Sequence, residues 1–365
     1  MSQLLQYINS LPDTSFEAVK AHFEAQNMEV KEEGPRYMLL SPTIQTIQTI
    51  QTGTILTKDT NCICCVGFPS TVDALETRPT EPGPFVVTNY LNGTLIRAYY
   101  ASDCWKLSTN RVMNAYDSFW GSQMSFADML DDCLQEKFSK SSLAAVLNTQ
   151  YSYQFIVQHP KDAFNHQIPL LFHIGTFNNT TLQYVHRDEV LHHPKVVSAV
   201  TQEHTFDTFE KIQEFVHVNQ SAQGVIFFPQ GQETTVRYKL LNPTFQARRN
   251  LLGNTPNFHL RYLECLAAGS EKHFLYEFPH MLPLAIAVQQ GLLTVMKDVH
   301  ALYMEKYIKQ NKLVPVLFAY RPILYALHGY YMKTHQKITK KIVSNTLYSY
   351  HPRRQFYILN SVGLI

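Results

Sequence analysis

Residues 86–111 read VVTNYLNGTLIRAYYASDCWKLSTNR, a stretch rich in strand-forming residues that contains two turn signals. Asn92-Gly93 is a turn signal, and residues 94–100 are rich in strand-forming side chains. Asp103 marks a second turn, after which residues 105–109 are predicted to pair back on the preceding strand. Taken alone, the pattern predicts a hairpin in a half-buried sheet.

The composition allows a buried core, although the charged fraction of 16% is low for a globular chain. The 365 residues are enough for two domains, and 45% hydrophobic residues can bury a substantial core. The formal net charge is +2, so the total charge predicts no general attraction to nucleic acid, and a basic binding site has to be local. No apolar run is long enough to cross a bilayer, and the first residues lack the segments of a signal peptide. We therefore expect an intracellular, cytoplasmic protein with no membrane partner.

Neither the cysteines nor the histidines predict a metal site. Three cysteines lie close together in a strand-like run, at Cys62, Cys64 and Cys65. No second pair of cysteines or histidines stands at zinc-binding spacing from them, so we expect buried, reduced thiols in a reducing compartment. Three histidines lie in the segment VHRDEVLHHP, at His186, His192 and His193. Because this segment has no H-E-x-x-H pattern, we interpret them as surface or loop residues.

The first part of the chain is predicted to mix helices with strands. Residues 1–34 are expected to form N-terminal helices, with Ser15 as a helix cap. Residues 43–52 repeat Thr-Ile-Gln with a period of three, whereas strand side chains alternate with a period of two, so we expect a low-complexity loop there. Strands are predicted over residues 36–40, 53–56, 62–69, 94–100, 105–109, 151–158, 170–176, 182–185, 224–228 and 234–241.

The later part is predicted to be helical. Strand patterns stop near residue 245. Helices are predicted over residues 125–138, 142–147 and 207–216 before this point, and over 258–267, 283–308, 313–328 and 334–348 after it. The change from α+β to all-α composition predicts two domains, residues 1–245 and 246–365.

The chain lacks several common motifs but contains a series of weaker ones. The patterns G-x-x-x-x-G-K-[ST], G-x-G-x-x-G and G-x-S-x-G are absent, which excludes the phosphate-loop, dinucleotide-binding and α/β-hydrolase interpretations. Six blocks then occur in a definite order, at residues 53–69, 90–111, 115–128, 151–160, 222–228 and 237–254. In this order, and with the helical tail, the chain resembles the phage-type RNA ligase 1 group of covalent nucleotidyltransferases, especially divergent members from large DNA viruses. The resemblance extends over residues 35–345.

This resemblance implies both a fold and a chemistry. The implied fold is an antiparallel nucleotidyltransferase core, RNA/DNA ligase-like and ATP-grasp-like, followed by an all-helical C-terminal domain. In such ligases a lysine of a K-x-D-G motif attacks the α-phosphate of ATP, the AMP is passed to an RNA 5′-phosphate, and a 3′-hydroxyl displaces it. This nucleophilic catalysis by an amine needs cationic groups and a divalent metal, usually Mg²⁺, around the phosphates.

Most family positions that carry this chemistry are replaced here. The K-x-D-G motif falls on residues 90–93, so Tyr90 stands where the resemblance places the nucleophilic lysine. No lysine lies between Lys58 and Lys106, so a short shift of the alignment does not restore one. The family's arginine, its two glutamates and its two later lysines fall on Thr52, Ile156, Gln223, Lys239 and Leu241. If a nucleotide site is retained, the resemblance assigns it to Tyr90, Asn92, Gly93, Arg111, Gln223 and Lys239.

Two functional hypotheses follow from these replacements. The combined loss predicts a ligase-like protein that has lost adenylyltransferase activity and acts as a binding or structural module, with no cofactor. The alternative is an active, divergent ATP-dependent RNA ligase that forms lysyl-AMP on another residue, Lys106 or Lys239, and requires ATP and Mg²⁺.

The helical tail carries a basic cluster that suggests RNA as a partner. Its members are Lys333, Lys337, Lys340, Lys341, Arg353 and Arg354. Tyrosines lie between them, which suits contact with phosphates combined with base stacking. An ordinary solvated helix face explains Lys337, Lys340 and Lys341 equally well. Viral or host proteins as partners, and association with a virion, also stay open at this point.

Overall fold

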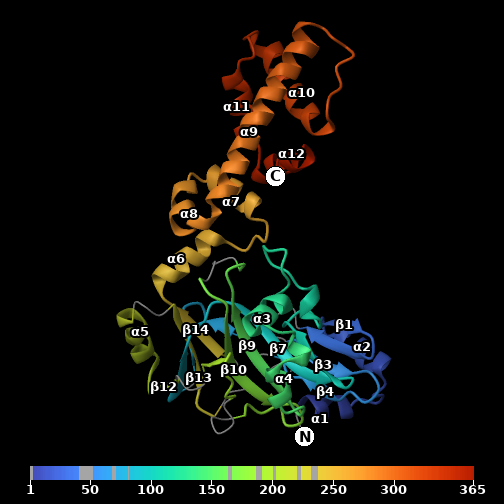
Figure 1. Cartoon of the computed structure of the whole chain (residues 1–365), viewed down its shortest axis with the longest axis vertical. Coiled ribbons are helices and arrows are strands. Elements are labelled where there is room, and N and C mark those ends of the chain that lie inside the picture. The colour runs from blue at the N-terminus through green and yellow to red at the C-terminus, as the bar shows by residue number, and fades with distance from the viewer. Residues whose placement is uncertain are drawn as a thin grey trace. The chain divides into compact units, whose positions relative to one another are not determined.

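The computed structural model describes residues 3–40, 52–67, 71–80, 82–162, 167–185, 191–199, 203–219, 223–231 and 237–365. The predicted loop at residues 43–52 lies outside this range except for Thr52. The chain divides into two compact units, Met1–Ala247 and Arg248–Ile365. We call them the sheet unit and the helical unit, because all described strands belong to the first (Figure 1). The division lies close to residue 245, where the strand patterns of the sequence stop.

The first layer of the sheet unit is a four-stranded antiparallel sheet with two helices. The helices are α1 (Gln3–Asn9) and α2 (Phe16–Ala25), and the strands, in spatial order, are β1 (Glu29–Glu33), β2 (Arg36–Leu40), β3 (Thr54–Thr57) and β4 (Ile63–Cys65). Because strand side chains alternate between two faces, β2 contributes to two cores. Leu39 packs with Phe23 of α2, and Met38 packs with Tyr99 of the next sheet.

The central sheet has five strands in the order β11-β10-β9-β7-β8. Their bounds are β7 (Thr94–Ala101), β8 (Cys104–Ser108), β9 (Tyr151–Gln158), β10 (Leu170–Asn178) and β11 (Val197–Ser198), and only β10 and β11 run parallel. One face of this sheet packs against α3 (Phe126–Leu134), α4 (Ser142–Val146) and the short 3-10 helices η1 (Ala115–Asp117) and η2 (Phe138–Lys140). Leu130 and Leu134 of α3 are fully buried against Phe155 of β9.

The third sheet also has five strands, in the order β12-β6-β13-β14-β5. Their bounds are β5 (Thr71–Asp73), β6 (Phe85–Asn89), β12 (Glu203–Phe206), β13 (Gly224–Pro229) and β14 (Arg237–Leu241). The pair of β14 and β5 is parallel, and the other pairs are antiparallel. Helix α5 (Phe209–Val218) covers one face, where Ile212 packs with Val225 and Phe227.

Residues 86–111 connect two of these sheets. Strand β6 belongs to the third sheet, whereas β7 and β8 pair in the central sheet, with Tyr99 opposite Lys106. The predicted pairing of residues 94–100 with 105–109 is therefore confirmed. The turn at residues 90–93 leads from one sheet to the other, so the position of this turn is determined by both.

The helical unit is built around one long helix, α9 (Leu282–Tyr303), whose residues Val288, Val295 and Val299 are fully buried. The other helices are α6 (Pro243–Leu252), which spans the division, and α7 (Phe258–Ala267), α8 (Glu271–Glu277), α10 (Arg321–Thr334), α11 (Lys340–Tyr348) and α12 (Pro352–Ser361). Shorter segments are the 3-10 helices η4 (Pro279–Met281) and η6 (Phe318–Tyr320), and a π-helical turn, η5 (Met304–Ile308).

Several predicted elements differ from the structure for identifiable reasons. Residues 29–33 were assigned to the N-terminal helices but form β1, because pairing with β2 outweighs local preference. The predicted strand at 182–185 is interrupted by Leu182, whose φ is +59°, and only an isolated bridge at Tyr184 remains. The helix predicted at 313–328 begins at Arg321. Pro322 then lies in the first turn, where proline is tolerated, instead of in the helix interior. The helix predicted at 334–348 is interrupted because His335 ends α10 with φ +54°, and α11 starts at Lys340.

No single helix in the described ranges has the length and hydropathy of a membrane span. Helix α8 and the helix from Pro279 to Ile308 meet these criteria only together, across a bend of 116°.

Candidate functional site

The turn between β6 and β7 is the first part of the candidate site. The Tyr90 amide donates a hydrogen bond to the Gly224 carbonyl at 2.8 Å, and the Tyr90 ring lies 5.8 Å from the ring of Phe245 in α6. Gly224 has a φ of +146°, and a Cβ there would lie 2.5 Å from the Leu240 carbonyl. Only glycine fits this position without strain. Tyr90, where the resemblance places a lysine, is therefore held between β13 and α6.

Two glutamine side chains hold the next turn residue. The Asn92 amide donates to Gln223 Oε1 at 3.1 Å, and Gln158 Nε2 donates to the Asn92 carbonyl at 2.7 Å. Asn92 is buried. Gln223 stands where the family has a glutamate, and its amide oxygen contacts the backbone of the turn. Gln158 was not singled out from the sequence, although a polar residue that closes an apolar strand is a recognisable signal.

Gly93 and Ile156 are in close contact beside the turn. A Cβ on Gly93 would lie 2.6 Å from Ile156 Cγ2 and 2.5 Å from the Val157 carbonyl, so β7 and β9 approach each other closely here. Ile156 lies opposite Leu95 in the sheet and is 9% exposed. Ile156, where the resemblance expects a glutamate, is thus an aliphatic side chain packed against the turn.

Lys239, which the resemblance matches to a family lysine, has an acidic neighbour. Its Nζ lies 3.9 Å from Asp73 Oδ2, and the two side chains are about a quarter exposed, 26% and 23%. The register of the third sheet places both residues in one row with Ile226 and Thr88 of neighbouring strands. Leu241, at the second lysine position, is buried and lies opposite Gly224. The cation that remains at this site is accompanied by a carboxylate.

Two further candidates from the sequence are Thr52 and Arg111. Thr52 precedes Gly53, whose carbonyl accepts a 2.6 Å hydrogen bond from Arg97 Nη1. Arg97 is fully buried and also donates to the Thr109 carbonyl at 2.6 Å, so it holds two loops together. Arg111 is exposed, and its carbonyl accepts a hydrogen bond from Lys31. Among the described residues, no hydrogen bond or ion pair joins Arg111 to the β6–β7 turn.

Lys106 is remote from this turn. Lys106 lies opposite Tyr99 of β7. Tyr99 is four residues along this strand from Leu95, which pairs with Ile156 beside the turn. At a rise of about 3.3 Å per residue, this separation is roughly 13 Å along the strand. Lys106 therefore does not replace the missing amine at Tyr90.

The residues brought together at the turn do not match the donor set for adenylyl transfer. The family chemistry needs an amine nucleophile and carboxylates that orient the nucleotide and metal. The matching positions here present a phenol, an aliphatic chain and two amides from Tyr90, Ile156, Asn92 and Gln223. The carboxylate that the described residues place beside Lys239 is Asp73, at 3.9 Å. We derive no reaction step with ATP or Mg²⁺ from this arrangement.

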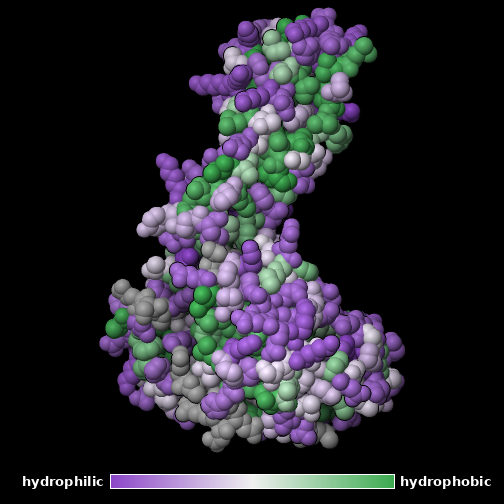
Figure 2. Space-filling model, viewed as in Figure 1, coloured by the Kyte–Doolittle hydropathy of each residue, from purple (hydrophilic) through white to green (hydrophobic). Residues whose placement is uncertain are grey.

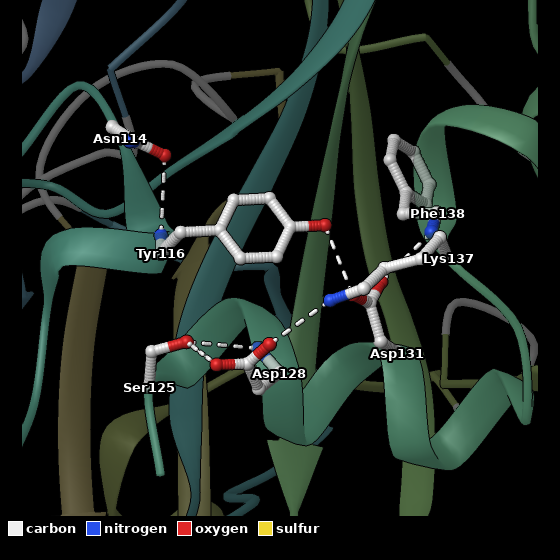
Figure 3. Close-up of polar contacts among 7 residues, drawn as sticks. All are labelled: Asn114, Tyr116, Ser125, Asp128, Asp131, Lys137 and Phe138. Atoms are coloured by element: carbon white, nitrogen blue, oxygen red, sulfur yellow. Dashed lines mark hydrogen bonds and ion pairs between the residues drawn. The ribbon is translucent and has the colours of Figure 1, made fainter. Parts of the chain in front are cut away.

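A second polar group lies beside α3 and is drawn in Figure 3. The Ser125 hydroxyl accepts a hydrogen bond from the Asp128 amide at 3.0 Å and donates to Asp128 Oδ2 at 2.6 Å, which caps the helix. Lys137 Nζ lies 3.1 Å from Asp128 and 2.9 Å from Asp131. The Tyr116 hydroxyl donates to Asp131 at 3.0 Å.

The contacts in this group have a structural role. Burial raises the pKa of Tyr116, and hydrogen bonds to Asp131 and Asp128 raise the pKa of Lys137. The Ser125 hydroxyl lowers the pKa of Asp128. These shifts all favour the usual charge states at neutral pH, and each charge has a partner. The network therefore fixes α3 to the preceding loop.

The histidine segment lies at the surface where it is described. His186 lies outside the described residues. His192 and His193 line an open surface hollow with Ser198, and His193 Nε2 is 3.1 Å from Ser142 Oγ. Among the described residues, no three His, Cys, Asp or Glu side chains are grouped to hold a metal ion. All six cysteines are free thiols.

The basic candidates of the tail are exposed: Lys333, Lys337, Lys340, Lys341, Arg353 and Arg354. None of the six forms an ion pair with a described residue. Four of them lie in the first turns of α11 and α12, and neither helix has an acidic residue there. Because a helix N-terminus carries partial positive charge, cations at this end are unfavourable for the helix. Their placement is therefore not explained by helix stability.

The two units carry opposite net charges. The helical unit has 15 lysines and arginines against 5 aspartates and glutamates, a net charge of +10. The sheet unit has 16 against 24, a net charge of −8. The total of +2 conceals this asymmetry. Counting charges separately on each side of residue 245 would have revealed it from the sequence.

Comparisons with known proteins give remote similarities. No family model matches the chain. A protein described as "Immediate-early protein ICP-46 homolog", from Invertebrate iridescent virus 6, is 24% identical over an alignment of 310 residues, which covers 74% of this chain. The alignment covers 66% of the viral protein, so the chain spans just under two thirds of its length.

The structural neighbours are ATP-dependent ligases. The structure titled "Putative ATP-dependent DNA ligase from Aquifex aeolicus" matches this chain with 15% identity and a TM-score of 0.42. The match covers 88% of this chain and 81% of the ligase chain. The structure titled "Archaeal ATP-dependent RNA ligase - form 1" matches with 11% identity and a TM-score of 0.45. The match covers 77% of this chain and 83% of the ligase chain.

Proposed function

We propose that this chain is a ligase-like protein that has lost adenylyl transfer and binds RNA through its helical unit. The first half of the proposal is carried by the β6–β7 turn. Tyr90 occupies the position of the nucleophile, Ile156 fills the place of a carboxylate against Gly93, and Lys239 lies beside Asp73. A single replacement could be compensated by a neighbouring residue, but these replacements come together at one junction.

The second half of the proposal is supported by charge. A net charge of +10 on the helical unit creates a local attraction for polyanions, and the six tail cations are exposed. Contacts between cations and phosphates supply most of the non-specific affinity for nucleic acid. Exposed Tyr330, Tyr348 and Tyr357 add aromatic faces to the same unit.

The loss of catalysis is tested by incubating the full chain with ATP labelled at the α-phosphate, together with Mg²⁺ or Mn²⁺. We expect no label on the denatured chain and no joining of RNA ends that carry a 5′-phosphate and a 3′-hydroxyl. Lys239→Ala and Tyr90→Phe are measured in parallel. Label that resists base in the native protein contradicts the proposal, and its disappearance in Lys239→Ala would identify the amine.

RNA binding is tested by measuring the affinity for a single-stranded RNA as the salt concentration is varied. We expect the double variant Lys340→Gln/Lys341→Gln to lower the salt slope by about 0.7 for each lost phosphate contact. Lys140→Gln/Lys161→Gln removes two exposed charges from the sheet unit and serves as the matched control, with no change expected. Absence of binding by the native protein at low salt refutes this half of the proposal.

A further inference from the structure

Five rings form a continuous series in the helical unit, which we call the aromatic stack: Tyr303, Tyr307, His328, Tyr331 and His335. The rings of Tyr307 and His328 are 4.2 Å apart at an angle of 18°, and Tyr331 lies 6.3 Å beyond His328 at 20°. Tyr303 lies 5.1 Å from Tyr307, and His335 meets Tyr331 edge-on at 6.3 Å. Three of the rings are thus nearly parallel.

The backbone that supplies this stack is unusual on one side. Tyr303 ends α9, and Tyr307 lies in the π-helical turn η5, which the Lys309 amide closes by donating to the Met304 carbonyl at 2.9 Å. Segments of π-helix are rare and occur frequently at functional sites. On the other side, α10 presents His328 and Tyr331 at a spacing of three residues, which places them on one helix face.

Two polar atoms in the stack are buried without a hydrogen-bond partner. Tyr303 is 1% exposed, and its hydroxyl has no partner among the described residues. The same holds for Nδ1 of His328. Buried polar atoms are rarely unpaired in folded proteins, so each needs an explanation. The unpaired atoms show that this contact between η5 and α10 is not optimised for packing alone, and the face of a nucleobase suits an aromatic stack.

The surroundings of the stack favour phosphates. Lys306 Nζ lies 5.9 Å from the centre of the Tyr307 ring, and Lys333 is exposed two residues after Tyr331. Lys337 follows the end of α10 and is exposed as well. Cations therefore come from both elements that build the stack, η5 and α10. The rings of Tyr307 and Tyr331 are only partly buried.

We propose that an unpaired base of single-stranded RNA binds at the end of the aromatic stack, against the partly exposed ring of Tyr331, with its flanking phosphates on Lys306 and Lys333. This proposal rests on the proposed RNA-binding function and specifies where the base is held. Because every base has a π-face, the site accepts bases with little sequence preference. Duplex RNA keeps its bases paired and stacked, so it binds through the cations alone.

The experiment compares two single-stranded RNAs with the full chain, one carrying 2-aminopurine at its centre and one carrying an abasic site there. We expect the 2-aminopurine fluorescence to be quenched on binding, and the abasic RNA to bind roughly 5- to 100-fold more weakly. This comparison uses the native protein, so it does not depend on the folding of a variant.

A pair of matched variants locates the base. Tyr331→Leu is expected to weaken binding and abolish the quenching, with the salt slope unchanged, because no phosphate contact is lost. Tyr357→Leu removes a half-exposed tyrosine of α12 outside the stack and is expected to leave both signals as in the native protein. Thermal unfolding verifies that each variant is folded.

The outcomes separate this proposal from the one on which it rests. If RNA binds with a salt slope that depends on Lys340 and Lys341, but equally well with and without the central base, the stacking site is refuted and RNA binding stands. Quenching that Tyr357→Leu abolishes and Tyr331→Leu preserves also refutes it. If the native protein binds no RNA, both proposals fail.

Discussion

Two sets of cations, one in each unit, are placed in opposite ways. In the sheet unit, Arg97 is fully buried and its guanidinium is used on the backbone carbonyls of Gly53 and Thr109. In the helical unit, cations such as Lys340 and Arg354 are exposed and have no described ion pair. Arg97 thus holds the chain of the sheet unit together, whereas the exposed cations of the tail leave their charge available to a partner.

The two units also differ in how many large apolar side chains they expose. Of the large hydrophobic residues that are exposed among the described residues, 13 lie in the helical unit and 6 in the sheet unit, although the helical unit is less than half as long. Figure 2 shows such hydrophobic residues on the visible surface of the helical unit, among hydrophilic ones. The buried contacts of one unit and the accessible surface of the other are separate features, and each can be altered alone.

The strongest test of this separation is Arg97→Met. The change leaves the Gly53 and Thr109 carbonyls buried without their charged donor, so we expect the sheet unit to lose about 3–5 kcal/mol of unfolding free energy. Denaturant unfolding, followed by probes specific to each unit, measures the loss. Arg111→Met removes an exposed arginine from the same sheet unit and should change stability by less than about 0.5 kcal/mol. An equal loss in the helical unit would show that the units are not independent.

A smaller effect is expected from acid. His173 is 1% exposed, and burial lowers its pKa to about 4. An unfolded histidine titrates near 6.5, so between pH 6.5 and 4 the unfolded chain binds more protons, and stability falls as pH falls. The expected loss is on the order of 2–3 kcal/mol at pH 4.

The control for this prediction is His173→Gln. The variant has no titratable group at this position but keeps a hydrogen-bonding group near Thr176, which lies 2.9 Å from His173 Nε2. Between pH 6.5 and 4, the unfolding free energy of the sheet unit should fall less steeply in this variant than in the native protein. The difference between the two slopes is the contribution of His173. An unchanged slope would assign the acid sensitivity to other groups.

The smallest expected effect is on the stability of the helical unit after Lys340→Gln/Lys341→Gln. Exposed charges without ion pairs contribute little, and these two lie at a helix N-terminus, where cations are unfavourable. We expect a change within about 0.5 kcal/mol, with any shift toward greater stability. Thermal unfolding of the full chain measures it. A marked destabilisation would show that these lysines hold the unit together after all.

Local patterns were sufficient to predict the parts of the fold that depend on neighbouring residues. The pairing of residues 94–100 with 105–109 followed from strand-forming residues around a turn, and α7 was predicted with its observed bounds. Strand β1 was missed because its sequence, EVKEE, has no strand pattern and gains its conformation from β2.

The candidate site was predictable only in part. The resemblance assigned Tyr90, Ile156 and Gln223 to one site, and this assignment stays a prediction. The pairing of Lys239 with Asp73 depends on β5, a strand 166 residues away that no pattern indicated. The aromatic stack escaped prediction for the same reason, because Tyr307 and His328 meet only when η5 and α10 pack together.

The two glutamines that hold Asn92 have a consequence for how the chain folds. Gln158 is 66 residues and Gln223 is 131 residues away from Asn92 in sequence. Contacts between distant residues require the closure of long loops, and such contacts slow folding. The turn at residues 90–93 therefore takes its final form only after the chain through Gln223 is present, so it is among the last local structures of the sheet unit to be completed during synthesis.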